Sequence, residues 1–187
     1  MAALGLAAIA AAAAGQAPVT GENLLFSPPK DFKVGYTASH DHTVITEFVP
    51  AAQSVQDWEQ MLTVQVFRGA SVDPATFLQG LGERYLKACP GTQAKGIFTG
   101  QANGYVVSML LLRCPNNPAT GQPETTAFRV TKGSDALYSV QHAWRRQVSD
   151  AEMDTAMHAL AAVLVCDNRA RAHPCPSLDA TAVPPGR

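Results

Sequence analysis

The tripeptide His40-Asp41-His42 is the clearest group of residues that could do chemistry. Neutral imidazole nitrogens bind zinc and copper, and residues two apart in a strand share a face, so His40 and His42 could supply two metal ligands. A third ligand would have to come from a distant histidine: His142, His158 or His173. The alternative is a solvated polar turn, because the tripeptide falls between two predicted strands. A metal site at His40 and His42 is therefore one hypothesis.

Arginines stand at the ends of two predicted strands. Arg113 ends the predicted central strand, and Arg145 and Arg146 follow Trp144 at the end of the last one. Guanidinium groups match carboxylates and phosphates, so these four residues could bind an anionic ligand. The alternative is that the arginines pair with surface acids while Trp144 packs in the core or at its rim. Antiparallel strands need not bring Arg113 to the edge that holds Arg145 and Arg146.

Motifs of known catalytic or cofactor sites are absent from the sequence. It contains no Gly-x-Ser-x-Gly nucleophile turn, no Walker loop and no Gly-x-Gly-x-x-Gly segment after a strand. Serine, histidine and aspartate are present but scattered. We therefore expect no cofactor and favour a non-enzymatic protein, with a hydrolase of unrecognised type as an alternative.

Length and composition fit one folded domain. The chain has 187 residues, of which 47% are hydrophobic and 16% charged. Its net charge is −1, and no basic patch is visible. Binding to nucleic acid by phosphate neutralisation is therefore not expected.

The first residues resemble a secretory leader. Residues 1–14 are almost wholly alanine, leucine, isoleucine and glycine, and small residues at Gly15 and Ala17 suit cleavage after Ala17. The usual basic residues after Met1 are missing. We expect a signal peptide over residues 1–17 and a single α+β domain over residues 18–187, poorly ordered after about residue 176. The mature chain has no other segment able to span a membrane, which predicts a periplasmic or secreted protein.

Four cysteines agree with an oxidising compartment. None forms a Cys-x-x-Cys pair, so zinc-ribbon and thioredoxin-like sites lack their usual signature. Four cysteines allow three connectivities, of which we favour Cys89 with Cys114 and Cys166 with Cys175. Each bridge would stabilise the fold by about 2–4 kcal/mol.

A meander over residues 104–146 is the predicted centre of the fold. Residues 104–114 are apolar on both faces of a strand, residues 124–132 alternate, and residues 136–146 return after a tight turn at Gly133-Ser-Asp135. The Pro-rich segment 115–123 has the composition of a loop. Short connections favour antiparallel neighbours.

The remaining elements extend and cover this meander. Strands are predicted over residues 32–39, 43–49, 61–67 and 96–101. One helix begins at Asp73-Pro74 and ends before Pro90-Gly91. A second follows the capping box Ser149-Asp-Ala-Glu152 and buries an apolar stripe of Met153, Met157, Leu160 and Leu164.

This order of elements resembles the PsbP/Mog1-type α/β/α sandwich. The matching features are the opening Phe32-Lys-Val-Gly-Tyr36 strand, the strand 61–67 before the Asp73 helix, the Gly104-Tyr105 strand start, and Gly133-Ser-Asp-Ala-Leu-Tyr138 before the last strand. The resemblance covers about residues 24–166. It implies an antiparallel β-sheet flanked by helices, and a protein that serves as a binding or assembly accessory.

The sequence therefore favours an exported, disulfide-stapled binding or assembly module of the bacterial envelope. Its partner would be an envelope protein or a small ligand, bound at a sheet face or at an exposed loop such as residues 115–123 or the turn at His40–His42. The alternatives are a periplasmic metal-binding protein that uses His40 and His42, and the hydrolase named above.

Overall fold

The computed structural model describes residues 20–176 of the chain. The predicted signal peptide, residues 1–17, and the predicted tail beyond residue 176 lie outside the described residues. The described elements, in chain order, are β1 (Glu22–Leu25), β2 (Phe32–His40), β3 (Thr43–Pro50), β4 (Gln60–Arg68), α1 (Pro74–Ala88), β5 (Gln93–Ala102), β6 (Tyr105–Asn117), β7 (Gln122–Lys132), β8 (Ala136–Trp144), α2 (Asp150–Ala161) and β9 (Leu164–Asp167).

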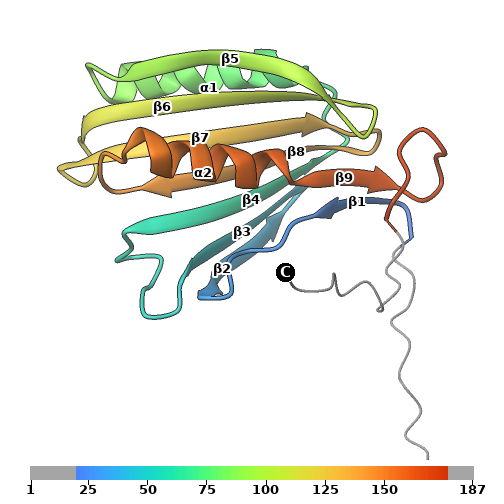
Figure 1. Cartoon of the computed structure of the whole chain (residues 1–187), viewed down its shortest axis with the longest axis horizontal. Coiled ribbons are helices and arrows are strands. Elements are labelled where there is room, and N and C mark those ends of the chain that lie inside the picture. Colours follow the sequence, from blue (N-terminus) through green and yellow to red (C-terminus); the bar gives the residue numbers. More distant parts are fainter. Residues whose placement is uncertain (1–19, 177–187) are drawn as a thin grey trace, which may run out of the picture.

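A seven-stranded antiparallel sheet in the order β2-β3-β4-β8-β7-β6-β5 forms the middle layer. The two helices of the described residues cover opposite faces of this sheet (Figure 1). Alternation along β6 explains the two layers, because successive side chains point to opposite faces. Leu110 and Leu112 pack with α1, while Leu111 packs with α2. The predicted fold class, an antiparallel sheet flanked by helices, is confirmed.

Helix α1 begins where the sequence predicts. The Asp73 carboxylate accepts hydrogen bonds from the backbone N–H groups of Ala75 and Thr76, and Pro74 occupies the first turn. Leu78 is fully buried in the cluster beneath the helix. The helix therefore covers the part of one sheet face formed by β5, β6 and β7.

Helix α2 is shorter than predicted. The capping box is present, because Ser149 and Glu152 each accept a hydrogen bond from the other's backbone N–H. The helix ends at Ala161, and Leu164, predicted on its apolar stripe, instead begins β9. None of the helices between residues 20 and 176 is long and apolar enough to cross a membrane.

Two short strands at the ends of the domain were not predicted. β1 and β9 pair antiparallel as a separate ribbon, with Leu25 opposite Leu164, and they lie side by side in Figure 1. Each has four residues, which is too short to show a period in the sequence.

The Glu22 carboxylate fixes this ribbon to the main sheet. It accepts hydrogen bonds from the hydroxyls of Tyr105 at 2.9 Å and Tyr138 at 3.0 Å, and from the backbone N–H groups of Ser134 and Asp135. A side chain at Gly133 would collide with this carboxylate. The turn between β7 and β8 therefore forms one half of the anchor, and two buried tyrosines form the other.

The prediction of a loop over residues 115–123 was wrong. β6 continues to Asn117 and β7 begins at Gln122, with a register shift between Cys114 and Asn117. Pro115 lacks a backbone donor, but β5 does not extend beside it, since β5 begins at Gln93, opposite Arg113. The exposed connection shrinks to residues 118–121.

Both disulfides join the pairs favoured from the sequence. Cys89 at the end of α1 bonds to Cys114 of β6, and Cys166 of β9 bonds to Cys175. The second bridge closes a loop in which the His173 ring stacks on Tyr105 with 3.8 Å between centroids. Both bridges attach the edges of the fold to its buried strands.

Candidate ligand-binding pocket

A pocket of about 780 Å³ lies beside α2, over the β4 and β8 side of the sheet. Seven strands about 4.8 Å apart make a face roughly 29 Å wide, whereas a helix is about 10–12 Å wide. Helix α2 lies over β7 and β8, so the face beyond β8 needs other cover. The segment after β1 supplies part of it through Phe26, whose ring packs on Phe48 with 5.6 Å between centroids. The space that remains is the pocket.

The pocket walls are mainly apolar. Apolar side chains come from the β1 end, β4, β8, the inward side of α2 and the start of β9: Leu25, Phe26, Leu62, Trp144, Leu160 and Leu164. Ala159 of α2 and Ala162, which caps the C-terminal end of this helix, also contribute small side chains. Binding sites for small molecules have this size and composition, with a few polar groups that fix orientation.

His142 and Gln60 provide uncharged polar atoms in this wall. The His142 ring stacks on Trp144 with 3.8 Å between centroids, and its Nε2 lies 3.3 Å from Oε1 of Gln60. Burial lowers the pKa of His142 to about 4. The imidazole is therefore neutral at pH 7, with one donor and one acceptor nitrogen.

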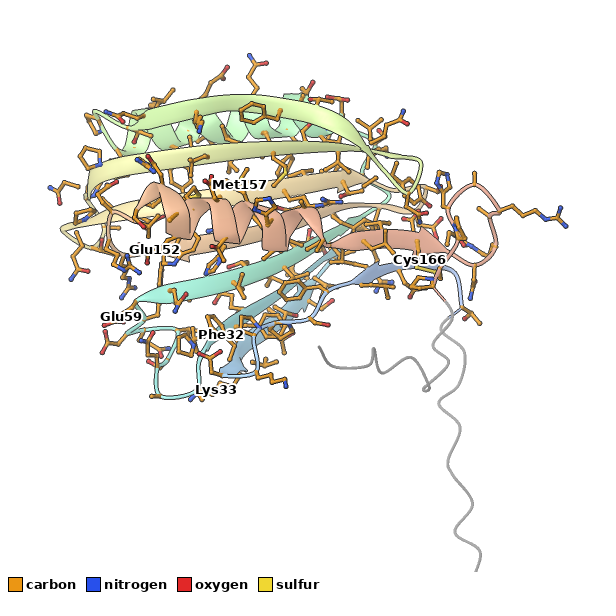
Figure 2. All side chains as sticks on the ribbon, in the orientation of Figure 1. Phe32, Lys33, Glu59, Glu152, Met157 and Cys166 are labelled. Atoms are coloured by element: carbon orange, nitrogen blue, oxygen red, sulfur yellow. A yellow bond between two sulfur atoms is a disulfide. The ribbon has the colours of Figure 1, made fainter. Side chains whose placement is uncertain are left out.

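An ion pair between Arg146 and Glu152 stands at the rim. Nη2 of Arg146 lies 2.7 Å from Oε1 of Glu152, and both side chains are about half exposed. Hydrogen bonds from Arg146 and then from Ser149 lower the pKa of Glu152 to about 2. Figure 2 shows Glu152 on the edge of α2 toward β4 and Met157 on the other edge. The rim is therefore charged but internally neutralised.

The structure brings together only two of the four residues proposed for an anionic ligand. Trp144 and Arg146 line the pocket. Arg145 lies between them in sequence and points away, with its guanidinium 4.3 Å from the centre of the Trp58 ring. Arg113 pairs with Asp150 at 2.7 Å, beside a separate groove at the start of α2.

His40 and His42 lie at the exposed turn between β2 and β3. Nδ1 of His40 is 2.9 Å from Oδ2 of Asp41, and the two side chains are 88% and 77% exposed. Within residues 20–176 no group of three or more histidines, cysteines, aspartates or glutamates could hold a metal ion. The other histidines lie elsewhere: His142 in the pocket, His158 on α2 and His173 against Tyr105. The metal site stays a prediction from the sequence.

Sequence reasoning named His142 only as a possible third metal ligand, and it did not identify Gln60 or the residues after β1 as parts of a site. The available signal was the alternation in β8, which places His142 and Trp144 on one face. Gln60 stands opposite Trp144 on β4, a neighbour that is distant in sequence. Only the strand order brings these residues into one wall.

Comparison with known proteins identifies similar folds. No protein-family model matches the chain, and no curated protein matches it in sequence. Among solved structures, it is similar to the cyanobacterial PsbP of Synechocystis (13% identity, 80% of this chain and 93% of that one, TM-score 0.46). It is also similar to the Ran-binding protein Mog1p of Saccharomyces cerevisiae (9% identity, 75% and 85%, TM-score 0.41). A third is LpqN, involved in cell envelope biogenesis of Mycobacterium tuberculosis (18% identity, 81% and 87%, TM-score 0.39).

PsbP and Mog1 are the proteins whose fold the sequence resembles. This chain shares less than one fifth of its residues with each of the three proteins, so the similarity describes the fold and says nothing of function. The site must therefore be interpreted from its own residues.

The buried imidazole predicts a specific dependence of stability on pH. The folded-state pKa of His142 lies below its ordinary value of 6.5, so the unfolded chain binds the proton first as the pH falls. The stabilisation is fully present above about pH 6.5 and is lost as the pH falls toward 4. Urea unfolding should show the wild type losing about 2–3 kcal/mol more than His142→Gln across this interval. Equal losses in the two proteins would contradict the buried neutral imidazole.

Proposed function

We propose that this protein is a non-enzymatic binding module that holds a small ligand in the pocket between α2 and β4. The supporting observation is the combination of an apolar space of about 780 Å³ with a short set of polar atoms on one wall. The stacked rings of His142 and Trp144 form part of the pocket wall, with Trp144 buried and His142 partly exposed.

Binding fits these polar groups better than catalysis does. In the Ser-His-Asp triad a carboxylate holds the histidine, whereas the neighbour of His142 is the amide of Gln60. The carboxylate of Glu152 is occupied by Arg146 and by the capping of α2. His142 has no hydroxyl or thiol as a hydrogen-bond partner among the described residues, and the hydroxyl beside Glu152, that of Ser149, caps α2.

We further propose that the protein works in the bacterial envelope or outside the cell. The leader-like residues 1–17 and two disulfides support this location, because disulfides persist in oxidising compartments. An export route would expose the pocket to ligands of the envelope.

Export makes a prediction about the mature chain. Protein recovered from its native cell should begin at Pro18, and its cysteines should resist alkylation until they are reduced. Intact-mass measurement with and without reduction reads both properties. A chain that keeps residues 1–17 and reacts at four free thiols would rule out this location.

Filling the pocket should weaken binding of an apolar probe. Ala159 lines the pocket, whereas Ala161 is exposed on α2 and is not part of the wall. A tryptophan at 159 would occupy the space, so Ala159→Trp should weaken binding of N-phenyl-1-naphthylamine at least about tenfold. The probe's fluorescence titration measures this affinity.

Ala161→Trp is the matched control, because it adds the same side chain two residues along the same helix. It should bind the probe as the wild type does. Equal affinities in all three proteins, or no binding by the wild type, would refute a ligand site in this pocket.

A further inference from the structure

We propose that the pocket selects an uncharged amphiphile, with an apolar body against the walls and a neutral hydroxyl, ester or amide group at His142 and Gln60. This inference rests on the proposed ligand-binding function. It adds the chemical class of the ligand.

The charges at the rim already have partners. Arg146 reaches both oxygens of Glu152, at 2.7 and 3.4 Å, so each charge meets its opposite. Glu152 also accepts hydrogen bonds from the backbone N–H and the hydroxyl of Ser149, at 3.0 and 2.9 Å. An anionic ligand would have to take Arg146 from Glu152, and a cationic ligand would have to displace Arg146. The net charge of these two groups is zero.

His142 and Gln60 can satisfy the hydrogen bonds of a neutral group, and no charged side chain has to give up its partner. An uncharged imidazole offers one donor and one acceptor, and the Gln60 amide offers both kinds of atom. One contact of 3.3 Å joins the two side chains, which leaves capacity on each. A hydroxyl can donate to one partner and accept from the other. An ionised carboxylate can only accept, and an ammonium can only donate.

The walls exclude a ligand that is polar throughout. Leu62, Leu160 and Leu164 surround the space from β4, α2 and β9, and Phe26 comes from the segment after β1. Burying polar groups against such walls without hydrogen-bond partners costs about 1–3 kcal/mol each. One polar end and an apolar body match the distribution of atoms in the pocket.

Three straight-chain probes of ten carbons each test the selection. Decan-1-ol, decanoate and decylamine carry a neutral, a negative and a positive terminal group, respectively, at neutral pH. Each is titrated against N-phenyl-1-naphthylamine bound to the full chain. Decan-1-ol should displace the dye at a concentration about tenfold lower than either ion, the difference of one well-made hydrogen bond.

Two variants separate the contribution of His142 from that of the ion pair between Arg146 and Glu152. His142→Phe keeps a ring to stack on Trp144 and removes the polar atoms, so it should weaken decan-1-ol about tenfold. Glu152→Gln introduces an amide whose oxygen can still accept the capping hydrogen bond, and it frees Arg146 from its ion pair, so decanoate should gain affinity relative to decan-1-ol. Glu83→Gln, on the exposed side of α1, is the matched control and should change neither ratio.

The outcomes distinguish failure of the neutral-ligand inference from failure of the proposed ligand-binding function. Equal displacement by all three probes, or preference for an ion in the wild type, overturns the neutral-ligand inference while binding itself stands. An unchanged ratio in Glu152→Gln also overturns it, even if His142→Phe fails to fold. A wild type that binds neither dye nor probe overturns the proposed function as well.

Discussion

A sheet face wider than one helix is the constraint on which the rest of this structure depends. Helix α2 has 12 residues and is therefore about 18 Å long and about 10–12 Å wide, so it can shield only part of a seven-stranded face. On the opposite face α1 sits over β5, β6 and β7. Beyond α2, other segments of the chain cover the face of β4 and β3 only in part. The pocket is the space that this incomplete cover leaves.

The ribbon of β1 and β9 sets the size of that space. Leu25 and Leu164 are paired in the ribbon, and both belong to the pocket wall. Glu22 holds the ribbon by binding two tyrosines and the turn between β7 and β8. The disulfide from Cys166 of β9 to Cys175 closes the loop in which His173 stacks on Tyr105 of the main sheet. Four charge-assisted hydrogen bonds on one carboxylate are strong enough to fix a strand of four residues. The hydrogen bonds of Glu22 therefore also fix the positions of Leu25 and Leu164 in the pocket wall.

Much of the fold could be predicted from the sequence because the signals are local. Each signal can be seen within a short stretch of sequence: the alternation over residues 32–49, the Asp73-Pro74 start of α1 and the capping box at Ser149. The ribbon could not be predicted, because β1 and β9 stabilise one another across about 140 residues and neither shows a pattern alone. The prolines of segment 115–123 indicate a loop in the sequence, and only the strand order shows that β5 begins opposite Arg113 and does not extend beside Pro115.

The candidate site was only partly predictable for the same reason. Trp144 and Arg146 were identified by residue type, but Arg113 and Arg145 share their chemistry and lie elsewhere. The sequence indicated His142 only as one of three histidines that could supply a third metal ligand. Its role depends on Gln60, which the register of β4 against β8 places nearby. A site built from neighbouring strands follows from topology, and residue types alone do not specify it.

The two tryptophans of the chain offer the most direct test of ligand binding in the pocket. Trp144 lines it, whereas Trp58 lies under Arg145 outside it. In a nitrogen-15 NMR titration with decan-1-ol, assigned with a Trp58→Phe variant, the indole signal of Trp144 should shift and that of Trp58 should stay in place. A shift of the Trp58 signal alone, or no shift of either at saturating alcohol, would contradict the account.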